Sequence, residues 1–286
     1  MVAVCASREE LWLALPHDRT RAVVMTMGAL HEGHARLIDA ARSDVGPSGH
    51  VTVTIFVNPL QFGPAEDFAR YPRTPESDID LAAAHGCDVI FLPGVVDVYG
   101  RAGGAAPGGI TIDPGALGGQ WEGRRRPGHF AGVLTVVMTL LQLTRAEVAF
   151  FGEKDYQQLT LIRAMARRFA LPVRIVGVPT VRDSDGLALS SRNAYLSQDE
   201  RARALAIPRG LFAAQRAADA GADADVVVDT VAAALAGSGL VADYIALTDP
   251  DLGPAPAMGE ARLLVAAGVG STRLLDNVPV MLRGAA

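Results

Sequence analysis

The chain has 286 residues, half of them apolar and a fifth charged, with a formal net charge of −5. This length allows one large domain or two smaller ones, and the small acidic charge argues against a nucleic-acid partner. The two cysteines, Cys5 and Cys87, have no CxxC spacing, which excludes a disulfide framework and a sulfur-ligated zinc site.

No segment predicts export or membrane insertion. The N-terminal stretch has no basic leader and carries Glu9 and Glu10 before its apolar residues, unlike a secretory signal. The longest apolar run, residues 132–143, is too short for the roughly 30 Å core of a bilayer and predicts a buried helix. We therefore expect a cytoplasmic protein that has no membrane partner.

Apolar, β-branched runs alternate with helical patterns through the first two thirds of the chain. Buried parallel strands are expected at residues 21–27, 51–57, 88–92, 147–151 and 173–178. Helices are expected at about 33–43, 75–86, 132–144 and 154–169. This alternation predicts an α/β fold with a doubly wound parallel sheet in a first domain, residues 1–181.

The alternation stops in two places. Residues 94–128 are rich in glycine, and we expect this irregular segment to be a lid or disordered. Later, an Ala-rich helical pair and three short strands follow one another, at 198–219, 223–237, 241–247, 261–269 and 272–278. We interpret residues 182–286 as a smaller C-terminal α+β domain.

Two histidines follow the first of these strands in MTMGALHEGH, residues 25–34. His31 and His34 are three residues apart, whereas the zinc-binding H-E-x-x-H helix separates its ligands by four, so a metal site is disfavoured. A strand-to-helix junction offers free amide groups at the edge of the sheet, where anions bind. A phosphate site is one interpretation, and ordinary packing of the two rings is the other.

Polar side chains also follow two further strands. FVNPLQFG carries Asn58 and Gln61, and FGEKDYQQL carries Lys154 and Gln158, which share a face if the segment is helical. Lys154 is the single lysine among 26 basic residues, and a compact ammonium suits a tight phosphate site that excludes a planar guanidinium. The alternatives are turn chemistry for Asn58 and a solvated helix start for Lys154.

The segment VRDSDGLALSSRN supplies Ser190, Ser191 and Arg192, whose hydroxyl and guanidinium groups are phosphate donors. By itself this composition is common in loops. Neither a Walker A motif nor a G-x-G-x-x-G fingerprint occurs, so nucleotide binding would depend on the histidines. We expect the imidazoles and Lys154 to converge on one triphosphate.

In this order and spacing, the stretches TMGALHEGH, FVNPLQFG, YPRT, RPGHFAGVLTVV, FGEKDYQQL and GLALSSRN resemble the pantothenate synthetase, or pantoate–β-alanine ligase, family. This family belongs to the HIGH-type nucleotidyl-transferases, which have a Rossmann-like fold. The resemblance implies that the carboxylate of (R)-pantoate attacks ATP to give pantoyl adenylate and pyrophosphate. The amine of β-alanine would then displace AMP to form pantothenate.

The resemblance also implies roles for individual residues. His34, as proton donor, and His31, Lys154 and Arg192 would be catalytic, and Gln61 and Gln158 would hold the substrate. The residues implied to bind ATP are Met27, Gly28, Ala29, Leu30, His31, Glu32, Gly33, His34, Gly152, Glu153, Lys154, Asp155, Val181, Leu189, Ser190, Ser191 and Arg192.

Three positions depart from the pattern of the family. Leu189 stands where methionine is frequent, an apolar change of similar volume, and Ala131 stands where arginine is frequent. The acidic pair after YPRT is Ser77 and Asp78 here, which leaves Asp78 as the candidate metal ligand. Mg²⁺ is expected to accompany ATP, and a homodimer formed through the larger domain is implied.

Two other functions are open. A cytidylyltransferase of the same superfamily would use the histidines but release a nucleotide-linked product, and the pair Gln61 and Gln158 favours the ligase. A non-catalytic nucleotide-binding regulator would have no need of charged groups aimed at a transition state, so Lys154 and Arg192 argue against it.

Overall fold

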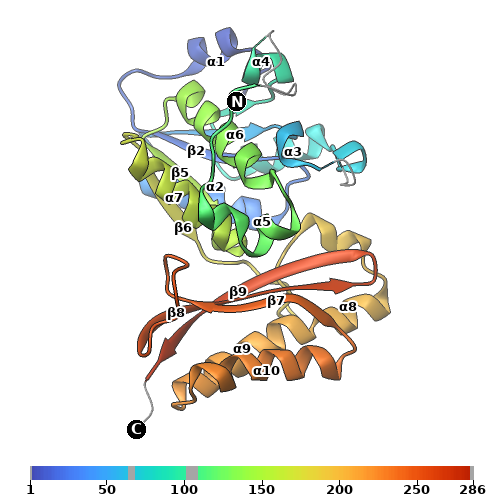
Figure 1. Cartoon of the computed structure of the whole chain (residues 1–286). Coiled ribbons are helices and arrows are strands. Elements are labelled where there is room, and N and C mark those ends of the chain that lie inside the picture. Colours follow the sequence, from blue (N-terminus) through green and yellow to red (C-terminus); the bar gives the residue numbers. More distant parts are fainter. Residues whose placement is uncertain (1, 64–67, 101–108, 284–286) are drawn as a thin grey trace. The chain divides into compact units, whose positions relative to one another are not determined.

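The structure is a computed structural model that describes residues 2–63, 68–100 and 109–283 (Figure 1). A six-stranded parallel sheet is built from β1 (Ala3–Cys5), β2 (Arg21–Thr26), β3 (His50–Ile55), β4 (Val89–Phe91), β5 (Val148–Gly152) and β6 (Arg174–Val178). Its strand order is β1-β4-β3-β2-β5-β6, so the direction of winding reverses between β2 and β5. The predicted doubly wound α/β sheet is confirmed.

Helices cover both faces of this sheet. One face packs against α1 (Arg8–Ala14), α4 (Val95–Tyr99), α6 (His129–Thr144) and α7 (Tyr156–Arg168), and the other against α2 (Glu32–Val45) and α3 (Pro75–Ala84). In β5, Ala149 and Phe151 join the first core, whereas Val148 and Phe150 join the second. Successive side chains of a strand point to opposite faces, which explains why these strands are continuous apolar runs in the sequence.

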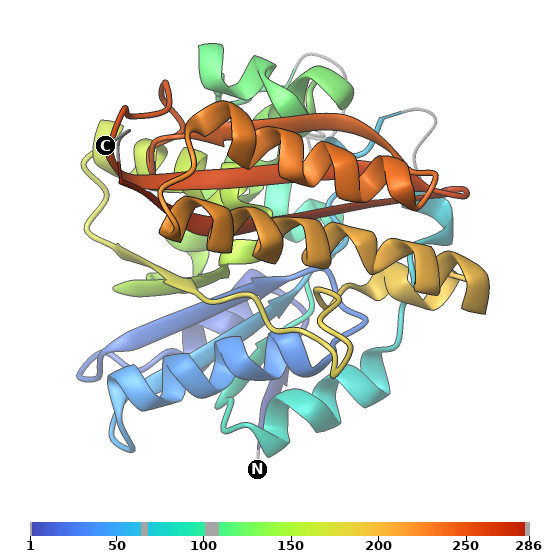
Figure 2. The same cartoon turned by 90° about the horizontal axis from the view of Figure 1, so that it is seen from below.

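A second sheet is antiparallel and three-stranded, with β7 (Val241–Thr248), β8 (Gly259–Val269) and β9 (Thr272–Leu282) in that order. Helices α9 (Ala206–Asp219) and α10 (Ala224–Gly237) lie side by side along one of its faces (Figure 2). The helix predicted at 198–219 is two helices, because α8 (Gln198–Ala204) ends before α9 begins. The ring of Pro208 would clash with the carbonyl of Ala204 in a continuous helix.

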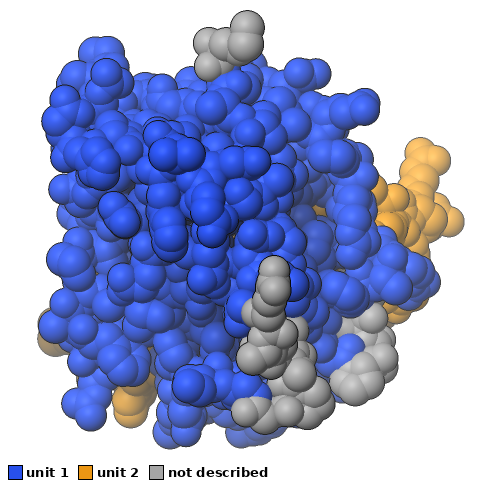
Figure 3. All heavy atoms as spheres, turned by 90° about the horizontal axis from the view of Figure 1, so that it is seen from above, with its two compact units in different colours: residues 1–153, 157–179 blue, residues 154–156, 180–286 orange. Residues whose placement is uncertain are grey.

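The chain forms two compact units, distinguished by colour in Figure 3. The first consists of residues 1–153 and 157–179, and the second of residues 154–156 and 180–286. Lys154 therefore belongs to the second unit, together with the antiparallel sheet. The expected division into separate domains at 1–181 and 182–286 stays a prediction.

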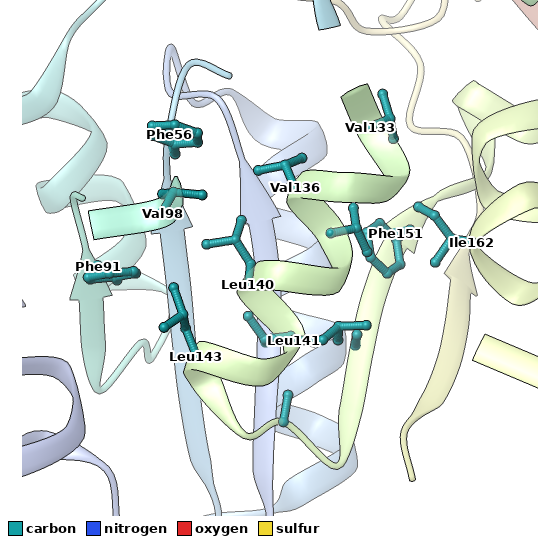
Figure 4. Packing of buried hydrophobic residues seen from close by; sticks show 14 of the residues in the cluster. Phe56, Phe91, Val98, Val133, Val136, Leu140, Leu141, Leu143, Phe151 and Ile162 are labelled. Carbon is teal, nitrogen blue, oxygen red and sulfur yellow. The ribbon is translucent and has the colours of Figure 1, made fainter. Parts of the chain in front are cut away.

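Helix α6 fills the core on one face of the large sheet. Figure 4 shows its side chains, among them Leu140, in one cluster with Phe91 and Phe151 of the sheet. The helix predicted from the apolar run begins slightly earlier than expected, at His129. Within the described part of the chain, no helix combines the length and apolar character needed to cross a membrane.

The expectation of an irregular segment at 94–128 is wrong in part, because α4, η3 (Ala116–Gly119) and α5 (Trp121–Arg125) lie within it. The buried side chain of Gln157 accepts a hydrogen bond from the Glu122 backbone and donates to the Leu117 and Gln120 carbonyls. These tertiary contacts order a glycine-rich sequence whose local pattern predicts a loop. Residues 101–108 lie outside the described residues, and a lid role stays a prediction.

Strand β1 and helix α1 were not expected. Three residues are too few to show a strand pattern, but α1 carries a recognisable signal. The hydroxyl of Ser7 accepts the N–H of Glu10, whose carboxylate accepts the N–H of Ser7. This reciprocal capping box is visible in the sequence as S-x-x-E.

Candidate functional site

The carboxyl ends of β2 and β5 meet at the point where the strand order reverses. The two strands pair directly, from Ala22 with Val148 to Val24 with Phe150. Residues 27–34 follow β2. Gly152 is the last residue of β5, and Glu153 follows it. Ligands of open α/β sheets bind outside the carboxyl ends of the strands at such a reversal. The first unit thus presents two of the predicted ATP-binding stretches at one edge of its sheet.

The loop after β2 has a strained backbone that a buried carboxylate stabilises. Gly28 and Ala29 have φ angles of +85° and +51°. The N–H groups of Ala29 and Leu30 donate to Asp78, at 3.0 Å to Oδ2 and 2.7 Å to Oδ1. A Cβ at Gly28 would lie 3.0 Å from Asp78 Oδ2, so glycine permits the close approach.

Asp78 is 2% exposed, and Thr74 donates a third hydrogen bond to its Oδ1. These contacts support a role in shaping the loop at 28–30. Among the described residues, no group of three or more His, Cys, Asp or Glu side chains is arranged to hold a metal ion. The role of Asp78 as a metal ligand stays a prediction.

His31 and His34 cap the N-terminus of α2, a position that Ser, Thr, Asp or Asn usually occupies. The Nδ1 atom of His31 accepts the N–H of Gly33 at 3.1 Å. In return, Nδ1 of His34 accepts the N–H of His31 at 3.3 Å. The two ring centroids are 4.2 Å apart. A pair of imidazoles therefore forms a reciprocal capping box.

This geometry favours one tautomer for each ring in its neutral form. A neutral imidazole whose Nδ1 accepts a hydrogen bond carries its proton on Nε2. His31 and His34 thus each have an Nε2–H donor, next to the positive end of the α2 dipole. Two N–H donors and a helix N-terminus make a suitable site for an anion such as phosphate.

The side chain of Gln61, after β3, is held in one orientation. Its Oε1 accepts a hydrogen bond from Asn58 Nδ2 at 3.1 Å, and its Nε2 lies 2.9 Å from Sδ of Met27. The Gln61 carbonyl accepts from His129 Nδ1 at 2.9 Å and from the Arg126 guanidinium at 3.3 Å. The amide hydrogens of Gln61 therefore face the loop that follows β2.

Asn58 has the turn role that we gave as its alternative, since its Oδ1 accepts the N–H of Leu60 at 3.1 Å. The same oxygen accepts the hydroxyl of Tyr99 at 2.6 Å. Burial raises the pKa of Tyr99, so this hydroxyl stays protonated and continues to donate. Asn58 thus connects the turn to Gln61.

Sequence reasoning did not assign roles to Arg126, His129 and Gly132, although they lie in or beside the RPGHFAG stretch. A Cβ at Gly132 would lie 2.2 Å from the carbonyl oxygen of Leu60, so only glycine lets α6 approach the Gln61 turn. The glycine was visible in the sequence, but its contact partner was not.

Of the two adjacent glutamines at the start of α7, only one is available to a ligand. Gln157 is buried and fully engaged with the segment at 117–122. Gln158 is partly exposed, and its side chain has no hydrogen-bond partner among the residues that the structure describes. The choice of Gln158 as a substrate contact agrees with this difference.

In the second unit, Lys154, Ser190 and Arg192 line one pocket, together with Asn193 and Asp276. The pocket unites three residues of the predicted phosphate set that come from two segments 36 or more positions apart. The Lys154 ammonium is 3.7 Å from the Asp155 carboxylate, and the lysine side chain is 20% exposed. It is therefore sheltered but still reachable by a ligand.

The expectation that Lys154 and Gln158 share a helix face is wrong. Lys154 lies in a short 3₁₀ turn, η4 (Glu153–Asp155), and α7 begins after it at Tyr156. The four-residue spacing therefore does not correspond to one helix. The two residues also belong to different units.

The loop that leads to Ser190 is closed by main-chain contacts. The N–H of Leu189 donates to the Val181 carbonyl at 2.9 Å, so these two predicted ATP-binding residues are neighbours. Ser190 caps the 3₁₀ turn η5 (Ser191–Tyr195) by accepting the N–H of Arg192 at 3.2 Å. This cap holds the backbone of Ser190, Ser191 and Arg192 in one turn.

Comparisons with known proteins cover nearly the whole chain. The profile of the family described as pantoate-beta-alanine ligase matches residues 4–279. The pantothenate synthetase of Salinispora arenicola (strain CNS-205) is 55% identical over 268 residues, which are 92% of each chain. That of Nocardioides sp. (strain ATCC BAA-499 / JS614) is 52% identical over 291 residues, with 96% of this chain and 84% of the relative covered.

Solved structures give the same result. The crystal structure of pantothenate synthetase from Thermus thermophilus has a TM-score of 0.89 and 41% identity, covering 96% of this chain and 98% of its own. The pantoate-beta-alanine ligase of Francisella tularensis, complexed with beta-gamma ATP and beta-alanine, has a TM-score of 0.77 and 32% identity, with 97% of each chain covered.

Proposed function

The chain belongs to the pantoate–β-alanine ligase family, and from this premise we propose that it forms pantothenate from (R)-pantoate and β-alanine through a pantoyl-adenylate intermediate. ATP is the second substrate, and AMP and pyrophosphate are released. The observation that carries the proposal is the imidazole pair that caps the N-terminus of α2, the helix that follows β2 at the strand-order reversal of the sheet.

In the first step, a carboxylate oxygen of pantoate bonds to the α-phosphorus of ATP, and the bond from that phosphorus to the bridging oxygen of pyrophosphate breaks. Negative charge accumulates on the phosphate oxygens during this exchange, so preorganised donors supply most of the catalysis. We assign this role to the Nε2–H groups of His31 and His34 and to the cations Lys154 and Arg192. His34 would protonate the departing oxygen.

In the second step, the neutral amine of β-alanine attacks the acyl carbon of the adenylate, the bond to the AMP oxygen breaks, and the amine loses a proton. The assignment of Gln61 and Gln158 to pantoate is supported by their amide groups. Asn58 donates to Oε1 of Gln61 and Met27 Sδ accepts one hydrogen of its Nε2, so Gln61 offers its second amide hydrogen to a pantoate oxygen. Gln158 has both a donor and an acceptor available.

The residues proposed to bind ATP are 27–34, Gly152, Glu153, Lys154, Asp155, Val181 and 189–192. Mg²⁺ usually keeps several waters and binds through substrate phosphates and one or two carboxylates. This agrees with a metal that arrives with ATP. We further propose that the enzyme acts in the cytoplasm and forms a homodimer. Light scattering, which measures the molar mass in solution, tests the homodimer.

The test of the adenylate is a half-reaction. Purified protein with Mg-ATP and pantoate, but without β-alanine, is expected to release close to one pyrophosphate per active site. Addition of β-alanine should then release AMP and pantothenate in equal amounts. Pyrophosphate release that requires β-alanine would contradict a separate adenylate, and release that needs CTP in place of ATP would favour a cytidylyltransferase.

A further inference from the structure

Strand β9 carries a buried amide that contacts the Lys154 segment. Asn277 is 3% exposed, and its Nδ2 donates to the main-chain carbonyl of Lys154 at 2.8 Å. The two residues are 123 positions apart and belong to the same unit. We infer that Asn277 is a positioning residue that fixes Lys154 for its work on the phosphates of ATP, an inference that rests on the proposed function.

The orientation of this amide is determined by Arg262 on the neighbouring strand β8. The Nε of Arg262 donates to Oδ1 of Asn277 at 2.7 Å. A guanidinium has donors only, so it selects the oxygen of the amide and leaves the NH₂ group for the Lys154 carbonyl. Arg262 and Asn277 lie on one face of the antiparallel pair, in the diagonal position where long side chains meet.

The same arginine holds the other end of the segment. Its guanidinium carbon is 3.9 Å from the ring centroid of Tyr156, and the Tyr156 hydroxyl donates to the carbonyl of Pro250 at 3.0 Å. Cation–π contacts of this kind are stronger when they are shielded from water, and Arg262 is buried. The segment 154–156 is thus held at two points, the main-chain carbonyl of Lys154 and the side chain of Tyr156.

Lys154 needs this support because its own local structure is weak. The turn η4 has three residues, and such 3₁₀ pieces have poor hydrogen-bond geometry and little stability of their own. The ammonium is attached to this turn, so the backbone of the turn sets the region that the ammonium can reach. Catalysis by positioning tolerates little error, since a displacement of about 1 Å can cost about a hundredfold in rate.

Asp276, the residue before Asn277, supports the segment that leads to Ser190 and Arg192 in the same pocket. Asp276 points to the opposite face of the sheet and accepts two hydrogen bonds from Arg182, at 2.6 and 2.9 Å. Arg182 bridges to Ala188, close to Ser190 and Arg192. Adjacent residues of β9 therefore support both lining segments, Asn277 by a direct contact with Lys154 and Asp276 through Arg182.

The test uses Asn277→Asp, which retains the acceptor for Arg262 but removes the donor to Lys154, and Asn277→Ser, whose single, shorter hydroxyl cannot keep both hydrogen bonds and adds no charge. We expect pantoate-dependent pyrophosphate release to slow by about ten- to a hundredfold in both variants. The KM for β-alanine should stay within twofold, because the second step does not use the leaving phosphates. Gln215→Ala is the matched control, since the Gln215 amide also donates to a distant main-chain carbonyl, that of Pro279, away from the pocket.

A double-mutant comparison tests whether the effect passes through Lys154. If it does, adding Asn277→Ser to Lys154→Ala should change the rate by less than about threefold, because coupled residues are non-additive. Independent, multiplying effects would overturn the inference, and so would wild-type rates in both Asn277 variants or failure of both to fold. A Lys154→Ala enzyme with a normal rate would instead reject the proposed role of Lys154 itself.

Discussion

The carboxylate of Asp78 accepts the backbone N–H of Ala29 at 3.0 Å, across 49 residues of sequence. Ala29 has a φ of +51°, a conformation that alanine rarely adopts, and the contact holds it there. The loop that leads to the two histidines therefore depends on a side chain from another helix. This relationship gives the first prediction.

Asp78→Asn is expected to cost about 1–3 kcal/mol of stability, because an amide nitrogen cannot accept a backbone N–H and leaves one buried donor unpaired. The KM for ATP should rise, whereas the Mg²⁺ concentration for half-maximal rate should stay unchanged. Urea unfolding and Mg²⁺ titration measure the two effects. A marked rise in the Mg²⁺ requirement would instead support Asp78 as a metal ligand.

His31→Asn should separate capping from catalysis. Asparagine is among the best N-cap residues, so the free energy of unfolding should stay within about 0.5 kcal/mol, whereas His31→Ala should cost about 1 kcal/mol. Both variants lose the Nε2–H donor, and we expect both to slow pyrophosphate release by about a hundredfold. A fully active His31→Asn enzyme would limit His31 to its structural role.

Lys154→Ala is expected to lose about a hundredfold or more in kcat with little change in Tm, because the ion pair of its ammonium with Asp155 is partly exposed. Lys154→Arg should not restore the rate if the pocket admits only the compact ammonium. Arg168→Ala, an exposed cation at the end of α7, serves as the control. A Tm loss that matches the loss of activity would point to a structural role.

His34→Ala should impair adenylation to a similar degree. It removes an Nε2–H donor and also the acceptor for the His31 N–H, so a loss of about 1 kcal/mol in stability is expected as well. Single-turnover pyrophosphate release measures the chemical step directly. An unchanged adenylation rate would remove His34 from the mechanism.

Stability should decrease in mild acid because of His50, which is 5% exposed at the start of β3. Burial lowers its pKa, Arg42, Arg19 and Arg21 lower it further, and Asp88 opposes them. The unfolded chain therefore binds a proton more readily, and this destabilisation begins as the pH falls through about 6.5. His50→Gln should flatten the dependence of Tm on pH below that value, and an unchanged slope would contradict the assignment.

The sequence by itself determined the central strands and the candidate chemistry. Strands buried on both faces must be continuous apolar runs, so the central β2, β3 and β5 were visible without a structure. The polar motifs at their ends, such as HEGH and FGEKD, were visible because parallel strands present their carboxyl ends at one edge. Apolar runs and the polar motifs that follow them involve residues close together in the sequence, so they can be recognised from the local pattern.

Only the tertiary structure decided which groups hold the site in shape. The contacts of Asp78 with Ala29, of His129 with Gln61 and of Asn277 with Lys154 join residues that are 49, 68 and 123 positions apart. The structure also removed Lys154 from the helix of Gln158. A hydrogen-bond partner is chosen by packing of the whole chain, which no periodicity records, so motifs name the reacting groups and the fold selects their supports.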